Sequence, residues 1–273
     1  MNTLLYITWN VDPVAFALGP VEVRWYGLLY ALGFVLGITL LAKMFKSEGY
    51  PEEWADKVLI YTIIATIIGS RLGHVFFYDW EYYSQHLSEI FMIWRGGLAS
   101  HGGVIAIIIS SWLLCKYTFH KSFLWFGDRF MIPAVFVGSM IRLGNLMNSE
   151  IYGGETSLPW GFQFVREYPA GTPLELIPAC HPTQIYEAGS YMLLFIVLLS
   201  LYYFTDAKKR EGLICGTAFA VFFLIRFLLE FIKNDQAAFE ADMVLNMGQL
   251  LSIPFILLGI GFIVYSFVKP KHK

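Results

Sequence analysis

Charged residues are scarce in this chain of 273 residues: Asp, Glu, Lys and Arg make up 15% of it, and 57% is hydrophobic. Because soluble domains carry about 25% charged residues, this composition excludes an ordinary soluble globular protein. The mean hydropathy of +0.57 points the same way. The sequence therefore predicts a polytopic membrane protein, and the formal net charge of -2 adds little to that conclusion.

Other features are rare or absent as well. The three cysteines are widely spaced, so they predict neither a disulfide framework nor a metal site, and we expect free thiols at Cys115, Cys180 and Cys215. The segment 1–20 lacks a basic region and is interrupted by Asp12, so we expect an interfacial arm rather than a cleaved signal peptide. No internal repeat is visible. A single transmembrane domain over 1–273 follows, with a small external cap at about 149–180.

Long apolar segments dominate the rest of the chain. A helix needs about 20 mostly apolar residues to cross about 30 Å of hydrocarbon. Seven segments meet this requirement: 26–44, 58–78, 98–117, 129–147, 183–204, 213–232 and 247–267. The sequence thus predicts an all-α fold with seven transmembrane helices.

The basic residues predict the orientation of these helices. They follow the first, third and fifth spans and the last one, at Lys43, Lys46, Lys57, Lys116, Lys121, Lys208, Lys209, Arg210, Lys269, Lys271 and Lys273. All of these positions share one side, which the positive-inside rule makes cytoplasmic. The N-terminus and the loop after the fourth span are then external, and the C-terminus is cytoplasmic.

The segment RLGNLMNSEIYGG (142–154) concentrates polar groups at the end of an apolar helix. An arginine at bilayer depth costs about 2.5–3.5 kcal/mol on insertion scales, so Arg142 is expected to face a wet or protein-lined space and bind an anion. Asn145 shares its helix face. Glu150 and a glycine turn at Gly153 follow. The alternative is a helix end with an interfacial cation, but termination alone does not need so many polar groups.

A second polar segment, RGGLASHGG (95–103), opens the third span. Ser100 is a candidate N-cap, and Gly102 and Gly103 leave backbone N–H groups accessible to a phosphate. His101 beside them suits a proton acceptor near neutral pH. A purely structural histidine at a helix start is the alternative, and the residues alone leave both open.

The sixth span carries Arg226 and Glu230 one helical turn apart. They form either a self-neutralised pair or a site in which Glu230 orients Arg226 toward a ligand, because a guanidinium group matches phosphate with paired donors. In the second span, Arg71 lies between two glycines whose spacing allows another helix to approach. Arg71 is expected to be structural, with a carboxylate or a lipid headgroup as its partner.

Two shorter segments complete the candidate site. Tyr26 stands at the external start of the first span, where it fits either an interfacial aromatic belt or the site. HPTQIYE (181–187) opens the fifth span with helix-start residues, and a supporting role is expected for it. Together with His101, Arg142 and Glu150, these positions are predicted on the external side, where they converge on an anionic headgroup.

The motifs spread along the chain resemble those of the prolipoprotein diacylglyceryl transferase family. They are WYG (25–27), HGG (101–103), RLGN with the residues that follow it, HPTQIYE, RFLLEF (226–231) and MGQLLSIP (247–254). The 142–153 segment is the most specific of them. The chain departs from the family pattern at Phe222, where tyrosine is usual, at Ser149, where glycine is frequent, and at Gly154, where arginine is frequent.

The resemblance implies a transferase of the bacterial inner membrane with its site toward the periplasmic leaflet. The implied reaction moves the diacylglyceryl group of phosphatidylglycerol to the lipobox cysteine of a prolipoprotein and releases glycerol phosphate. Membrane lipids and the precursor's signal peptide are the implied partners, and no nucleic acid, cofactor or metal is expected. By motif, the implied functional positions are Tyr26, His101, Gly102, Gly103, Arg142, Asn145, Glu150, Gly153, Arg226 and Glu230. Of these, His101, Arg142, Arg226 and Tyr26 are the expected catalytic residues.

Two other classes of protein also place polar residues inside a membrane. A transporter for an anionic lipid or solute typically has related halves, and neither RLGN nor HGG recurs here. An intramembrane serine protease needs a serine activated by a histidine, and Ser139 is the nearest candidate, without a supporting motif. Both alternatives fit the sequence less well than the transferase.

Overall fold

The computed structural model describes residues 6–234 and 243–268. This part of the chain contains seven helices long and apolar enough to cross a membrane, which confirms the predicted number and the mainly helical fold. They are α1 (Trp25–Ser47), α2 (Glu53–Phe77), α4 (Ser100–Leu114) with a π-helical end (Cys115–Phe119), α5 (Phe123–Met147), α6 (Thr183–Phe204), α7 (Leu213–Leu229) with a 3-10 end (Glu230–Ile232), and α8 (Met247–Val268). The basic residues Lys269, Lys271 and Lys273 lie outside the described residues.

The largest error in the predicted spans is at the start of α5, which begins at Phe123 rather than at 129. Asp128 looked like a boundary because a charged side chain is costly inside a membrane. In the structure its carboxylate is fully buried and accepts hydrogen bonds from the backbone N–H groups of Gly212 and Cys215, both over 2.8 Å. The acidic group therefore caps the start of α7, and helix α5 continues through it.

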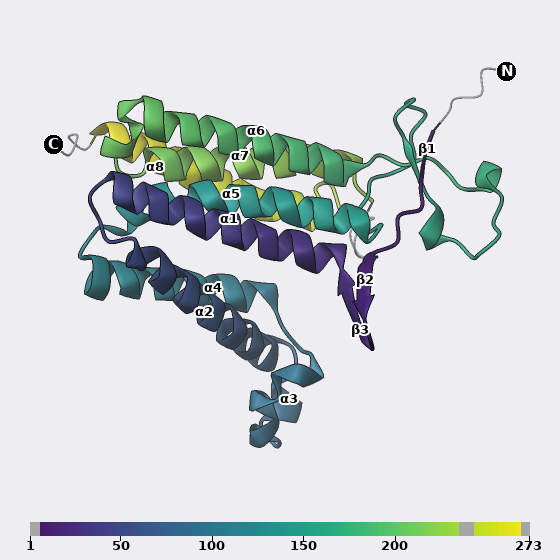
Figure 1. Ribbon diagram of the computed structural model, residues 1–273, viewed down its shortest axis with the longest axis horizontal. Coiled ribbons are helices and arrows are strands. Elements are labelled where there is room, and N and C mark those ends of the chain that lie inside the picture. Colours follow the sequence, from purple (N-terminus) through teal and green to yellow (C-terminus); the bar gives the residue numbers. More distant parts are fainter. Residues whose placement is uncertain (1–5, 235–242, 269–273) are drawn as a thin grey trace. The chain divides into compact units, whose positions relative to one another are not determined.

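Contacts between residues divide the chain into two compact units, and each is described by itself. The first comprises residues 1–37 and 127–273, and the second comprises residues 38–126. In the first unit, α6, α7 and α8 lie alongside α5 and the first half of α1 (Figure 1). Helices α7 and α8 approach closely at Gly216 and Gly259, where a Cβ on Gly259 would lie 2.7 Å from the Gly216 carbonyl oxygen. Small residues permit this separation.

The first unit also carries a small cap, as expected at about 149–180, but its short strands and the contribution of the N-terminal segment were not predicted. Strand β1 (Ile7–Trp9) pairs in parallel with β4 (Phe162–Phe164), and β2 (Val14–Leu18) pairs antiparallel with β3 (Val21–Arg24). Two 3-10 turns, η4 (Val165–Glu167) and η5 (Leu174–Leu176), complete it. Trp9 fixes the cap to α5 by donating to the Leu146 carbonyl over 3.0 Å. The strand was missed because its partner lies more than a hundred residues away in the sequence.

All three cysteines are buried free thiols, as predicted. Cys180 belongs to the cap, where it packs with Leu146, Phe162 and Phe164. Burial, with a smaller contribution from Glu155, raises the pKa of the Cys180 thiol. This thiol is therefore a packing group rather than a reactive one.

In the second unit, α2 packs against α4 through glycines on both helices. A Cβ on Gly73 would lie 2.8 Å from the Gly102 Cα, and one on Gly103 would lie 2.6 Å from the Ser70 hydroxyl. Gly69 also contacts the Gly102 carbonyl group and Ala106. The prediction that the glycines around Arg71 allow a close helix contact is confirmed.

The loop between α2 and α4 contains α3 (Trp80–Tyr83), η1 (Leu87–Phe91) and η2 (Ile93–Arg95). Arg71 holds this loop from α2. Its guanidinium donates to the carbonyl groups of Glu89, Ile90, Gly96 and Gly97 over 2.6, 2.8, 2.7 and 3.3 Å. Its side chain also lies over the Tyr83 ring, 4.9 Å from the centroid. The structural role predicted for Arg71 is thus confirmed, but its expected carboxylate or headgroup partner is wrong, because backbone carbonyls take all of these donors.

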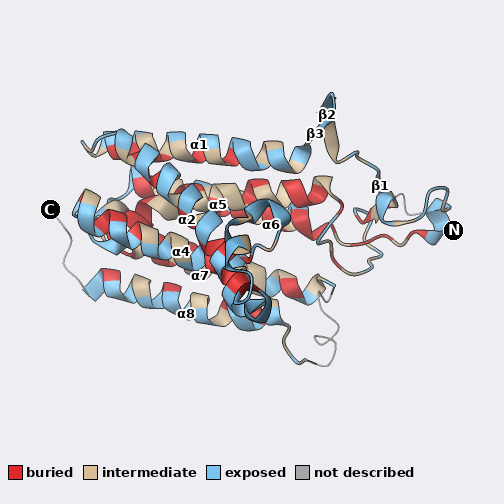
Figure 2. Cartoon of the chain, turned by 90° about the horizontal axis from the view of Figure 1, so that it is seen from below, coloured by how far each residue is buried: buried red, intermediate tan, exposed pale blue. Residues whose placement is uncertain are grey.

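Exposed residues run along the length of the helices, as expected of surfaces that face lipid (Figure 2). In the first unit, basic residues gather at one end of the bundle: Lys208 lies over the Tyr202 ring, and Arg210 lies over the Phe267 ring. That end holds the last turns of α6 and α8 and the first turn of α7. The polar residues of the candidate site lie at the opposite ends of the same helices, and the orientation of these ends in the membrane stays a prediction.

Candidate functional site

The last two turns of α5 supply the first part of the site. Arg142 donates to the Asn145 side-chain oxygen over 3.2 Å, so the two residues share a helix face as predicted. The Asn145 amide in turn donates to Glu150 Oε1 over 2.8 Å, and Asn148 donates to the same oxygen over 3.2 Å. The structure therefore brings together the polar residues that the sequence placed at the end of this span.

The turn after α5 has an unusual backbone. Ser149 and Ile151 both adopt positive φ, at 58° and 59°, which is rare for residues with a side chain and strained for a β-branched one. Side chains of α6 hold this turn: Thr183 donates to the Ile151 carbonyl over 3.0 Å, and Gln184 donates to the Glu150 carbonyl over 2.8 Å. The HPTQIYE segment thus has the supporting role expected of it, and it fixes Glu150.

Glu187, the last residue of that segment, is the anionic partner of Arg142. Its side chain is fully buried, and its Oε2 lies 2.9 Å from Arg142 Nε. The Tyr191 hydroxyl, one helical turn further along α6, donates to the other carboxylate oxygen over 3.3 Å. Phe222 of α7, where the family usually has tyrosine, stacks on the Tyr191 ring with centroids 4.2 Å apart. The hydroxyl at this place therefore comes from α6.

The end of α7 supplies the second arginine. Arg226 Nε lies 3.7 Å from Glu230 Oε1, so the predicted pair is present, although it is loose. Glu230 is nearly fully buried and has a closer partner, the ammonium group of Lys233 at 3.2 Å. Asn246 donates to the Glu230 side chain over 3.4 Å, and Gly248 at the start of α8 leaves room for the carboxylate. Two segments of the chain, the end of α7 with Lys233 and the start of α8, therefore fix Glu230.

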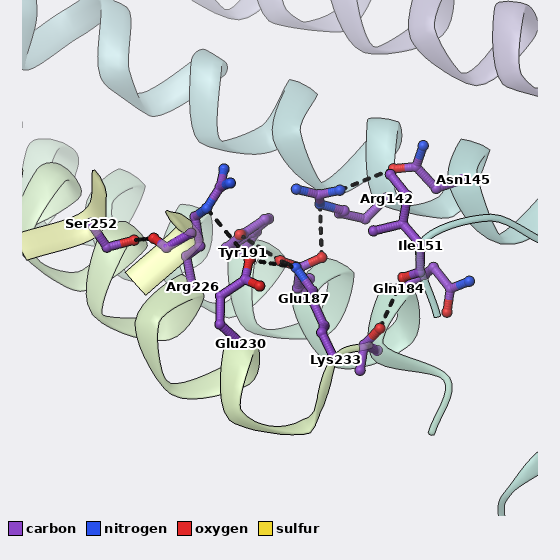
Figure 3. A network of polar contacts seen from close by, with 12 residues as sticks. Arg142, Asn145, Ile151, Gln184, Glu187, Tyr191, Arg226, Glu230, Lys233 and Ser252 are labelled. Carbon is purple, nitrogen blue, oxygen red and sulfur yellow. Dashed lines mark hydrogen bonds and ion pairs between the residues drawn. The ribbon is translucent and has the colours of Figure 1, made fainter. Parts of the chain in front are cut away.

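Lys233 joins the two halves of this site. Besides Glu230, it contacts Glu187 Oε1 over 2.9 Å, and its side chain is only 2% exposed. The result is an alternating chain of charges, Arg142, Glu187, Lys233, Glu230 and Arg226, shown in Figure 3. Sequence reasoning did not single out Lys233, and it gave Glu187 only a supporting role. A basic residue three positions after Glu230 was the available signal, because that spacing puts both on one helix face.

The two arginines keep donors for a ligand. Among the described residues, Asn145 and Glu187 are the polar partners of Arg142, and Glu230 is that of Arg226. Figure 3 shows the terminal nitrogens of Arg226 pointing away from Glu230. The Arg142 and Arg226 side chains are 16% and 33% exposed, in contrast to the buried carboxylates behind them. Each carboxylate therefore holds the Nε side of an arginine and leaves its outer donors accessible.

Tyr26, in the first turn of α1, lies against the end of α5. A Cβ on Gly144 would lie 2.7 Å from the Tyr26 ring, so this glycine makes room for the tyrosine. The ring also stacks with Tyr30, with centroids 6.3 Å apart. Tyr26 therefore packs against the last turns of α5, which also carry Arg142 and Asn145.

Gly153 packs where a larger residue would collide with its surroundings. A Cβ there would lie 2.8 Å from the Thr183 methyl group and 2.9 Å from the His181 Cβ, and would also contact the Ile232 carbonyl oxygen. Its N–H donates to the His181 carbonyl over 2.8 Å, and the Gly154 N–H donates to the Ile232 carbonyl over 2.9 Å. Both glycines thus join the turn after α5 to α6 and to the end of α7.

The HGG segment lies in the second unit, at the start of α4. Ala99 occupies the N-cap and Ser100 is the first helical residue, so the prediction of Ser100 as N-cap is wrong. The N–H groups of Gly102 and Gly103, expected to be accessible to a phosphate, both donate to the Ala99 carbonyl, over 3.1 and 3.3 Å. Close packing on α2 explains these glycines in the structure, and phosphate binding by them stays a prediction.

His101 is exposed, and its ring contacts Phe77 and Tyr78, with centroids 5.1 and 5.6 Å apart. It lines a cavity of about 420 Å³ together with Tyr78 and His74. The His74 imidazole lies 3.4 Å from the Asp79 carboxylate. His101 is therefore accessible to a reactant within its own unit, as a proton acceptor must be.

The structure also bears on the protease alternative and on metal binding. Ser139, the candidate nucleophile of a protease, is buried and donates to the Ala188 carbonyl over 2.8 Å, so it joins α5 to α6. Within residues 6–234 and 243–268, no group of three or more His, Cys, Asp or Glu side chains is arranged to hold a metal ion. The site of the first unit is built for an anion, through arginine donors.

Comparison with known proteins agrees with this geometry. A family model described as prolipoprotein diacylglyceryl transferase matches residues 13–265. A phosphatidylglycerol–prolipoprotein diacylglyceryl transferase of Porphyromonas gingivalis is 47% identical, over 99% of this chain and 98% of its own length. Proteins of the same name from Tolumonas auensis and Bacteroides fragilis are 43% and 37% identical, over 94% and 100% of this chain and 96% and 99% of their own lengths. The chain is a multi-pass membrane transferase and belongs to the prolipoprotein diacylglyceryl transferase family.

Proposed function

We propose that this chain transfers the diacylglyceryl group of phosphatidylglycerol to the cysteine thiol of a prolipoprotein, and that Arg142 and Arg226 bind the phosphate of the lipid. The printed names of its full-length relatives support the reaction. The observation that carries the site is that both arginines are anchored through Nε by buried carboxylates, while, among the described residues, Asn145 is the one polar partner of their outer donors, at Arg142 Nη1. Guanidinium groups held in this way match the oxygens of a phosphodiester.

The reaction breaks the bond between the glycerol C3 of the diacylglyceryl group and its phosphate oxygen. The cysteine sulfur attacks that carbon, a thioether forms, and the thiol proton passes to a base. Glycerol phosphate leaves with the bridging oxygen and one more negative charge than the phosphodiester had. Preorganised cations stabilise this developing charge most effectively in a site that excludes water. Arg142 and Arg226 are the groups proposed to do so.

The remaining site residues have supporting roles in this proposal. Asn145 and Glu150 present polar groups beside Arg142, Tyr26 packs against the same turns of α5, and Gly153 fixes the turn that carries Glu150. Glu230 orients Arg226.

The HGG segment is proposed to serve the incoming thiol. His101 is proposed as its proton acceptor, because free cysteine ionises only near about pH 8.5 and the thiolate is the nucleophile. Gly102 and Gly103 are proposed to border the lipid beside it.

The proposed setting is the bacterial inner membrane. The basic ends of the helices are cytoplasmic in this proposal, so the arginine site faces the periplasmic leaflet. The prolipoprotein's signal peptide and its lipobox cysteine are the proposed second substrate.

The test is an in vitro assay with purified protein in detergent, phosphatidylglycerol and a lipobox peptide, in which thioether-linked product is detected by mass spectrometry. Product is expected with phosphatidylglycerol and not with phosphatidylcholine, and equimolar glycerol phosphate is expected with it. A peptide whose cysteine is replaced by serine serves as the control. Peptide cleavage without lipidation, or lipid movement without product, would overturn the proposal.

A further inference from the structure

Lys233 has no place in the proposed chemistry, yet it is the most enclosed cation of the site. Its side chain is 2% exposed, and it contacts Glu187 Oε1 at 2.9 Å and Glu230 Oε1 at 3.2 Å. A buried lysine is costly unless it is paired, so its retention between two carboxylates needs an explanation.

The two carboxylates that Lys233 joins are those that hold the arginines. Glu187 contacts Arg142 Nε through its other oxygen at 2.9 Å, and Glu230 contacts Arg226 Nε at 3.7 Å. Glu187 belongs to α6 and Glu230 to the end of α7, so Lys233 fixes the distance between two helices. The backbone supports this link, because Gly153 and Lys233 form a β-bridge next to the turn after α5.

The charges of the five linked residues do not sum to zero. Three cations, Arg142, Lys233 and Arg226, face two carboxylates, Glu187 and Glu230. One positive charge is left over on these five residues, available to an anionic lipid, and Glu150, a further carboxylate of the site, is linked to Arg142 only through Asn145. Without Lys233 the two arginines would only balance the two carboxylates. The guanidinium groups would then be drawn onto the carboxylates and would have fewer donors for a ligand.

We propose that Lys233 is a positioning residue for the lipid phosphate: it separates and neutralises Glu187 and Glu230, so that Arg142 and Arg226 present their outer donors at a fixed spacing. It touches neither the thiol nor the phosphate. This inference rests on the proposed binding of phosphate by the two arginines, and it extends that proposal to a residue outside the candidate set.

The experiment compares Lys233→Met and Lys233→Arg with the wild type by lipidation kinetics, with phosphatidylglycerol and the peptide varied separately. Lys233→Met is expected to raise the KM for phosphatidylglycerol about 10- to 100-fold, the scale of a lost positioning partner, and to leave the KM for the peptide unchanged. Lys233→Arg keeps the charge in a larger group and is expected to raise the same KM only about threefold. Lys209→Met, at an exposed pair with Asp206, is the matched control and is expected to behave as the wild type.

A merely structural role gives a different result. It would lower the yield of monodisperse protein in size-exclusion chromatography and leave both KM values of the surviving protein at the wild-type level, which would overturn the inference. If Lys233→Met does not fold, Lys233→Arg decides, because an unchanged KM for phosphatidylglycerol in that variant also overturns the inference.

Arg142→Lys and Arg226→Lys, measured in parallel, separate the two proposals. If Arg142→Lys and Arg226→Lys both keep wild-type kinetics, phosphate binding by the arginines is wrong. If the arginine variants lose activity but the Lys233 variants keep wild-type kinetics, only the inference about Lys233 fails.

Discussion

Arg142 Nε lies 2.9 Å from Glu187 Oε2, and this ion pair joins the end of α5 to the start of α6. The carboxylate is fully buried, while the arginine side chain is 16% exposed. Because the carboxylate takes only the Nε side of the guanidinium group and Asn145 accepts one bond from Nη1, the remaining outer N–H donors stay available. This ion pair and the looser one between Arg226 and Glu230 are the basis of the predictions for the two arginines and for Glu187.

Replacing either arginine by lysine is expected to abolish most of the lipidation activity while the protein still inserts. Lysine keeps the charge but cannot hold a carboxylate and a phosphate at once through a planar fork. The measurement is the lipidation rate per folded protein for Arg142→Lys and Arg226→Lys. Near-normal turnover in either variant would assign that arginine a structural role only.

Glu187→Gln is expected to lower both stability and activity. Removing one partner of a buried ion pair leaves the other charge uncompensated, at a cost of about 3 kcal/mol or more. Here the affected cations are Arg142 and Lys233. Thermal unfolding in detergent measures the loss, and Glu175→Gln, at an exposed position in η5, is the control. Equal stability of the two variants would contradict the role given to Glu187.

His101→Gln is expected to lower the rate at pH 7 by about 10²- to 10⁴-fold, the usual contribution of a general base. Raising the pH should recover part of this loss, because the peptide thiol ionises without help near about pH 8.5. Lipidation rates of both proteins from pH 6.5 to 9 provide the check. A rate ratio that stays constant over this range would mean that His101 orients lipid or packs the helix start, and that another residue is the base.

Arg71→Lys is expected to loosen the loop between α2 and α4. Four carbonyl groups accept hydrogen bonds from the guanidinium, and a lysine ammonium cannot replace all of them. Leaving such groups without donors costs about 1–3 kcal/mol. Limited proteolysis of residues 84–97 and thermal unfolding measure the effect. Arg95→Lys, at an exposed pair with Glu89, is the matched control, and similar behaviour of the two variants would contradict this role.

The orientation of the chain is expected to follow its basic residues. Reporter fusions after Lys46, Lys121 and Arg210 should report the cytoplasm, and fusions near Glu167 should report the periplasm. The inverted pattern would place the arginine site on the wrong side of the membrane for exported precursors.

The sequence by itself determined the helices and most of the candidate site. Apolar length predicted seven spans, because crossing hydrocarbon imposes a strict requirement on composition. The cost of a charge in a membrane singled out Arg142 and Arg226, and helix spacing paired them with Asn145 and Glu230. These inferences are local, so they needed no knowledge of how the helices pack.

Only the tertiary structure decided which charges meet across helices. Lys233 and Glu187 are 46 residues apart, and Glu187 reaches Arg142 from another helix, so no periodicity in the sequence connects them. The strands of the predicted cap were missed for the same reason, since β1 pairs with a strand far along the chain. The partners of Arg71 could not be predicted for a different reason. They are backbone carbonyl groups, which every residue carries, so no sequence pattern identifies them. Pairings between distant segments depend on packing, and packing is a property of the folded chain alone.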